Sequence, residues 1–179
     1  MLLQKQLLKA VSKPGDTPLV LDALATYADW KKQFPDDYQK SVHFDRVEGT
    51  AYYYELITSL YSAYPDQIKN ADDLDRALAL LATREDIYVD IGLVSEGYQV
   101  DGFACVLLDR LESDWKERLM KDPNATPIEM LLQHFAAEPL PAPVTPTQPD
   151  IDAVGAKIQQ QLENSNPSKL FRMLYDMLF

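Results

Sequence analysis

Four polar side chains recur along one expected helical face near the middle of the chain. Their spacing of three or four residues places them side by side on an α-helix: Glu48, Tyr52, Glu55 and Ser59. A carboxylate inside an otherwise apolar helix costs free energy unless a cation pairs with it. Gly49 weakens a helix by about 1 kcal/mol relative to alanine, and its missing side chain would let a backbone or an ion approach Glu48. Glu48 is therefore either a metal ligand or catalytic carboxylate, or an ion-pair partner of Arg46 or of a lysine on a neighbouring helix.

The run Glu48-Gly49-Thr50-Ala51-Tyr52 resembles the third-ligand helix of gluzincin-type zinc peptidases. In those enzymes a glutamate followed by Gly-x-Ala and an aromatic residue supplies the third zinc ligand. The resemblance implies that Glu48 is a zinc ligand, with Tyr52 and Glu55 as neighbours of the site. A second stretch, from Gly97-Tyr98 to Trp115-Lys116, is similar to the helical region after this glutamate. The resemblance covers roughly residues 40–120.

The H-E-x-x-H element that supplies the two histidine ligands in those peptidases is missing from this chain. Zinc there polarises a carbonyl and activates water, with the glutamate of the motif as general base, so we expect no catalysis by this chain alone. Two interpretations fit. The chain is the helical C-terminal portion of a zinc metallopeptidase whose zinc helix lies upstream of Met1, or it is a degenerate relative. In the first, zinc binds only with the upstream ligands and a peptide is the expected substrate; in the second, catalysis has been lost and no cofactor is expected.

The other residues that could do chemistry are isolated from one another in the sequence. The only histidines are His43, expected at a helix start, and His134, expected at the edge of the core. Cys105 lies in an apolar run, where burial raises a thiol's pKa and makes it unreactive. The tyrosine-rich run 52–64 is interpreted as core packing with hydrogen-bonded hydroxyls, with a substrate groove as the alternative.

Charge and composition exclude several classes of function. The formal net charge is −11, and an acidic surface repels nucleic-acid phosphates, so we expect no nucleic-acid partner. No apolar run approaches the roughly 20 residues that a membrane span requires. The single cysteine excludes an internal disulfide. We expect a cytoplasmic protein by default, and a secreted or periplasmic one stays open if the chain is a fragment.

Helix signals along most of the chain predict an all-α multi-helix domain. Proline stops and capping residues delimit the expected helices at 1–12, 18–34, about 41–64, 73–82, 98–119, 128–136, 150–163 and 167–179. The apolar residues of 41–64 surround the helix, so we expect this helix to be central and buried on most sides. Thr126-Pro127-Ile128-Glu129 is a helix start with a capping box. Residues 87–93 could form either one short extended segment or a bent helical connection.

A proline-rich stretch predicts the division of the chain. We expect a helical body at 1–137, a stiff linker at 138–149 and a C-terminal helical pair at 150–179. The last helix carries an apolar strip with Leu170, Leu174 and Leu178, which must dock on another surface. The alternative to a peptidase is therefore a non-enzymatic, acidic, helical interaction protein that binds a protein partner through its C-terminal apolar helix.

Overall fold

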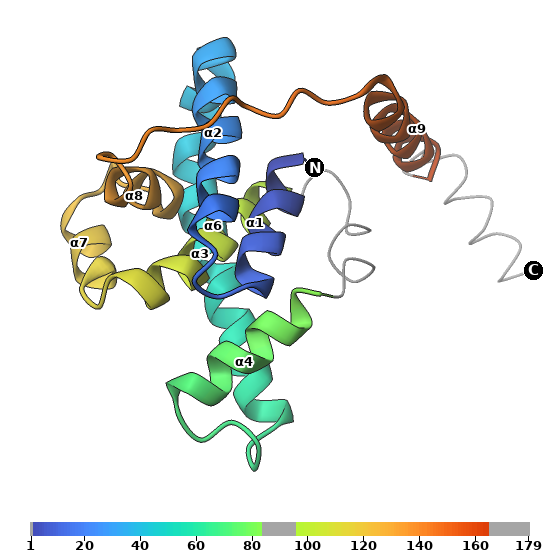
Figure 1. The fold of residues 1–179 in the computed structure, drawn as a ribbon. Helices are drawn as coiled ribbons and strands as arrows, with labels where there is room; N and C mark the ends of the chain where they lie inside the picture. The colour runs from blue at the N-terminus through green and yellow to red at the C-terminus, as the bar shows by residue number, and fades with distance from the viewer. Residues whose placement is uncertain (1, 84–95, 165–179) are drawn as a thin grey trace, which may run out of the picture. The chain divides into compact units, whose positions relative to one another are not determined.

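The computed structural model describes residues 2–83 and 96–164. These ranges contain eight α-helices (Figure 1). They are α1 (Leu2–Ser12), α2 (Thr17–Gln33), α3 (Pro35–Ala63), α4 (Ala71–Leu81), α6 (Glu96–Leu111), α7 (Trp115–Lys121), α8 (Pro127–His134) and α9 (Gln148–Asn164). No strand occurs in these ranges, and the prediction of an all-α domain is confirmed. The 87–93 segment lies outside the described residues. None of the described helices is long and apolar enough to cross a membrane.

The contacts divide the chain into two units, Met1–Val144 and Thr145–Phe179. The first unit contains α1 to α8, and the second contains α9. Residues 139–147 have no regular secondary structure and are exposed, as expected for a run rich in proline. The predicted linker and C-terminal helical pair stay predictions, because residues 165–179 lie outside the described part of the chain.

The central helix of the first unit is α6. Every residue from Asp101 to Leu108 is buried, because α1, α3 and α8 all pack against α6. The expectation that the helix at 41–64 would be central and buried on most sides is wrong. Only Gly49, Tyr53 and Leu60 of α3 are buried, because α3 packs mainly against α6 along one face.

Three helix boundaries differ from expectation for local reasons. α3 already begins at Pro35, because proline fits the first helical turn and Asp36 and Asp37 complement the positive end of the helix dipole. α4 is capped by Asn70, whose side chain accepts from the amide of Asp73 at 2.9 Å. The expected helix at 98–119 is divided, since α6 ends at Leu111 before α7 begins.

Two glycines let α3 and α6 approach each other closely. A Cβ atom on Gly49 would lie 2.3 Å from Cβ of Asp101, and one on Gly102 would lie 2.5 Å from Cδ1 of Tyr52. Separations this short are incompatible with a side chain at Gly49 unless a helix moves. The glycine beside Glu48 therefore has a packing explanation: its bare side faces α6.

Candidate functional site

The three residues of the predicted zinc site all lie on α3, at positions that share one side of the helix. Glu48 is partly buried and Glu55 is exposed. Tyr52 is partly buried, with its ring edge-on to Phe103 at a centroid distance of 6.2 Å. Among the described residues, no group of three or more His, Cys, Asp or Glu side chains is placed to hold a metal ion. A ligand role for Glu48 stays a prediction that depends on further ligands.

Arg46 does not form an ion pair with Glu48. Its guanidinium donates to the carbonyl oxygens of Leu119 and Ala125, at 2.7 and 2.9 Å, and to that of Asp122. Carbonyls at the C-terminal end of a helix lack intrahelical partners, so a cation there satisfies them and complements the helix dipole. Arg46 thus fixes the end of α7 to α3.

The histidines and the cysteine also lie apart from one another. His43 is exposed near the start of α3. His134 lies at the surface at the end of α8, where its Nδ1 is 2.8 Å from Oε1 of Glu112, rather than at the edge of the core as expected. Cys105 is fully buried, and burial raises the pKa of its thiol, as expected for an unreactive cysteine.

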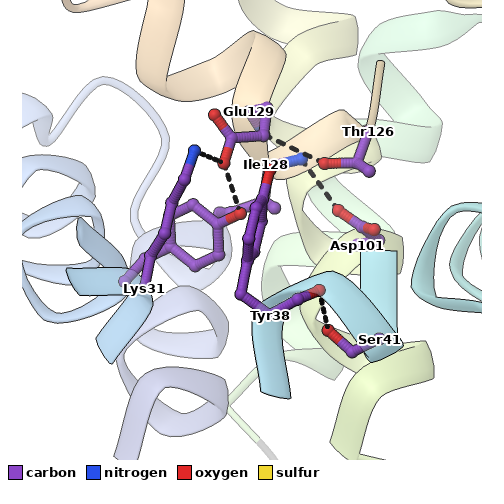
Figure 2. Close-up of polar contacts among 8 residues, drawn as sticks. Lys31, Tyr38, Ser41, Asp101, Thr126, Ile128 and Glu129 are labelled. Atoms are coloured by element: carbon purple, nitrogen blue, oxygen red, sulfur yellow. Dashed lines mark hydrogen bonds and ion pairs between the residues drawn. The ribbon is translucent and has the colours of Figure 1, made fainter. Parts of the chain in front are cut away.

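A partly buried polar cluster joins α2, α6 and the start of α8, beside the first turns of α3 (Figure 2). Tyr27 Oη and Lys31 Nζ both donate to Glu129 Oε1 at 2.6 Å. The Lys31 ammonium also lies over the ring of Tyr38, 4.4 Å from its centroid. Burial, then the hydrogen bond to Glu129, raises the pKa of Tyr27. Burial alone would lower the pKa of Lys31, but the Glu129 hydrogen bond and charge outweigh it and the pKa is raised.

Asp101 connects α6 to the N-terminus of α8. Its Oδ1 accepts the backbone amide of Ile128 at 2.8 Å, while the Thr126 hydroxyl accepts that of Glu129 at 3.3 Å. These two acceptors satisfy amides that a helix start leaves free, so the predicted cap at Thr126 is confirmed. The Glu129 side chain does not complete a capping box, because it binds Tyr27 and Lys31 instead.

The Asp101 carboxyl is fully buried, and burial raises its pKa to about 8. The hydrogen bond from the Ile128 amide opposes this increase, whereas the nearby carboxylates of Asp45 and Glu129 contribute to it. Burial also raises the pKa of Asp45. Although a raised pKa is typical of catalytic acids, no part of Asp101 is accessible to a substrate. The cluster therefore acts as a connection between helices. Sequence reasoning missed it, although a lone aspartate in an apolar helix is the same signal that drew attention to Glu48.

The face of α3 that lies opposite its buried residues Gly49 and Tyr53 is apolar and exposed. We call it the α3 stripe, and it comprises Phe44, Val47, Ala51, Tyr54, Thr58 and Tyr61. The spacing of three and four residues places these side chains in one row on the side of α3 opposite Gly49, and the first of them, Phe44, also contacts a ring of α6. The four large side chains are about half exposed, with fractions of 45 % for Phe44, 50 % for Val47, 53 % for Tyr54 and 40 % for Tyr61.

Two aromatic rings of the α3 stripe pack against neighbouring rings. Phe44 packs on Tyr98 of α6 with a centroid distance of 5.2 Å, and Tyr54 packs edge-on to the buried Tyr53 at 5.1 Å. A ring that is already restrained loses little conformational freedom when it enters an interface. The stripe is therefore a row of partly ordered apolar side chains on a well-packed helix.

In comparisons with known proteins, no family model, curated protein or solved structure matches the chain.

Proposed function

We propose that the chain is a non-enzymatic interaction domain that binds an amphipathic helix of a partner protein along the α3 stripe. The observation that carries this function is the row of half-exposed apolar side chains at heptad-like spacing over about five turns of one helix. Single exposed apolar residues are ordinary on protein surfaces, whereas a contiguous row of them is typical of a binding site.

Helix-on-helix recognition fits this row better than binding of a small molecule. Anchors at intervals of three and four residues match the interval at which a second helix presents its own apolar side chains. Two of the large anchors are tyrosines, which are enriched at the energetic centres of interfaces. The C-terminal apolar helix remains a separate predicted binding element, since its residues lie outside the described part of the chain.

A neutral amphipathic peptide tests the binding function without any contribution from charge. The probe is a labelled three-heptad peptide with leucine at the a and d positions and glutamine elsewhere, titrated with the full chain by fluorescence anisotropy. We expect saturable binding that weakens at least about tenfold in the double variant Val47→Gln, Tyr54→Gln, because truncating a central anchor typically costs 1–3 kcal/mol, on the order of tenfold or more.

The control places the same chemical change elsewhere on the surface. Leu80 and Met120 are exposed on α4 and α7, so the double variant Leu80→Gln, Met120→Gln should bind the peptide as the unmodified chain does. Circular dichroism melting confirms that both variants fold. Absence of binding, or equal loss in both double variants, would refute a binding role for the stripe.

The zinc-peptidase hypothesis stays a separate proposal, supported by the Glu48-Gly49-Thr50-Ala51-Tyr52 pattern alone. It requires two histidine ligands from outside these 179 residues, so zinc should bind only when they are present. Stoichiometric, hydrolysis-competent zinc in this chain by itself would contradict it.

A further inference from the structure

The α3 stripe carries charge along one edge only. We call this the acidic edge, and it consists of Glu48 and Glu55, one helical repeat of seven residues apart. Glu48 follows Val47 and Glu55 follows Tyr54, so both carboxylates lie on the same side of the row. No lysine or arginine occurs between Arg46 and Lys69, and Arg46 is held by carbonyls of the α7 end. Lys40, the other cation of α3, lies eight residues before Glu48 and pairs with Asp37 at 3.8 Å, so no cation of α3 pairs with the acidic edge.

We propose that the partner helix is basic, with lysine or arginine flanking its apolar row. This inference rests on the binding function proposed above and specifies the chemistry of the partner. Opposite charge along an interface favours the encounter and fixes the register of the two helices. The net charge of −11 extends the same preference beyond the two glutamates.

The tyrosines of the stripe add a second reason to expect cations. An ammonium or guanidinium group binds favourably over the face of a phenol ring. The described residues already make this contact, with Lys31 Nζ at 4.4 Å from the Tyr38 ring centroid and Lys116 Nζ at 5.1 Å from that of Tyr53. Tyr54 and Tyr61 offer exposed rings of the same kind to a partner.

A second copy of the chain is a poorer occupant of the stripe. In an antiparallel pair centred on the stripe, Glu48 of one copy would lie opposite Glu55 of the other, and like charges placed opposite each other repel. Two chains of charge −11 would also repel each other during approach. A basic helix removes both costs.

Three peptides that differ only in flanking charge test this inference. All share leucine at the a and d positions, and the remaining positions carry lysine and arginine, glutamine, or glutamate. With the full chain we expect the basic peptide to bind about tenfold tighter than the neutral one, and the acidic peptide to bind more weakly than both. The advantage of the basic peptide should shrink in high salt, because salt screens exposed charges.

Matched charge variants locate the effect. The double variant Glu48→Gln, Glu55→Gln should reduce the preference for the basic over the neutral peptide to about threefold or less, because the general acidity of the chain remains. The control Glu117→Gln, Glu138→Gln removes two exposed carboxylates elsewhere and should keep the full preference. Equal loss in the two double variants would assign the preference to net charge and overturn the acidic edge as its source.

The remaining outcomes separate this inference from the binding function itself. Acidic and basic peptides binding equally, with both lost in Val47→Gln, Tyr54→Gln, would overturn the basic partner and leave the binding function standing. A dimer in analytical ultracentrifugation that the same double variant dissolves would make a second copy the occupant. Peptide binding that appears only after deletion of residues 165–179 would make that segment the occupant. No binding by any peptide to any form would refute both proposals.

Discussion

The two faces of α3 differ in what the fold requires of them. The buried face carries Gly49 and Tyr53, and each is explained by a contact: Gly49 with the backbone of α6, and Tyr53 with Asp109 and Trp115. The exposed face carries large apolar side chains such as Val47 and Tyr61, for which the described part of the molecule offers no covering element. A single helix thus combines residues selected by packing with residues whose apolar character remains to be explained by binding.

Gly49→Ala should lower the free energy of unfolding, because Gly49 lies where α3 and α6 approach each other most closely on the buried face. The new Cβ would meet Cβ of Asp101 at 2.3 Å and backbone atoms of α6 at 3.2 Å, so the helices must separate. Overpacking of this kind costs about 1–3 kcal/mol, more than the roughly 1 kcal/mol that alanine gains over glycine in a helix. We therefore expect a lower urea midpoint, measured by circular dichroism.

Gly155→Ala is the control for this substitution. Gly155 lies within α9, and a Cβ there meets nothing within 4 Å. This variant should leave the urea midpoint unchanged or raise it, since only helix propensity changes. If Gly49→Ala behaves in the same way, the close approach of α3 and α6 is refuted.

Asp101→Asn should show how much the fold is destabilised when the buried Asp101 carboxyl, which lies at the close contact of α3 and α6, ionises. The pKa of Asp101 is about 8 when folded, against an ordinary value of 3.8. Between those pH values the folded state keeps a proton that the unfolded state has released, so stability falls as pH rises through this window. The contribution of the neutral carboxyl is complete below pH 3.8 and lost above about 8.

Asparagine retains the oxygen that accepts the Ile128 amide and cannot ionise. At pH 9 we expect the variant to melt higher than the unmodified chain, by at least about 1 kcal/mol, and the difference should narrow as pH falls and vanish only below about pH 4, where Asp101 is protonated in both the folded and the unfolded state. The difference between the two proteins isolates Asp101 from Asp45, whose pKa is also raised by burial. Parallel melting curves across this range would mean that Asp101 is ionised in the fold.

These features differ in how far the sequence could predict them. The fold class and the cap at Thr126 were predictable, because helical periodicity and capping depend on residues close together in the chain. The contact between Asp101 and the Ile128 amide was not predictable. The two groups belong to different helices, and only the packing of α8 on α6 brings them together. For the same reason, apolar residues all around α3 suggested burial on most sides, although part of that surface is exposed. Periodicity indicates an apolar face without indicating which molecule covers it.

The adjacent residues Tyr53 and Tyr54 provide the smallest and most direct comparison of the two faces. Tyr53 is buried, and its hydroxyl donates to the Asp109 carboxylate, which also accepts from Trp115 Nε1 at 2.8 Å. Burial and this hydrogen bond raise the pKa of Tyr53. Tyr53→Phe should therefore cost about 1–2 kcal/mol, because a hydrogen bond to a charged group is lost. Tyr54→Phe, at an exposed position, should change the free energy of unfolding by less than about 0.5 kcal/mol.

Urea unfolding of the two phenylalanine variants measures this difference within one helix and with one chemical change. A cost at Tyr53 alone means that the buried face stabilises the fold while the exposed face is free to evolve for binding. Equal costs at both positions would mean that the Tyr54 hydroxyl also serves the fold. The stripe would then be partly structural, and the peptide-binding loss in Val47→Gln, Tyr54→Gln would have to be corrected for lost stability before it could be assigned to a direct contact.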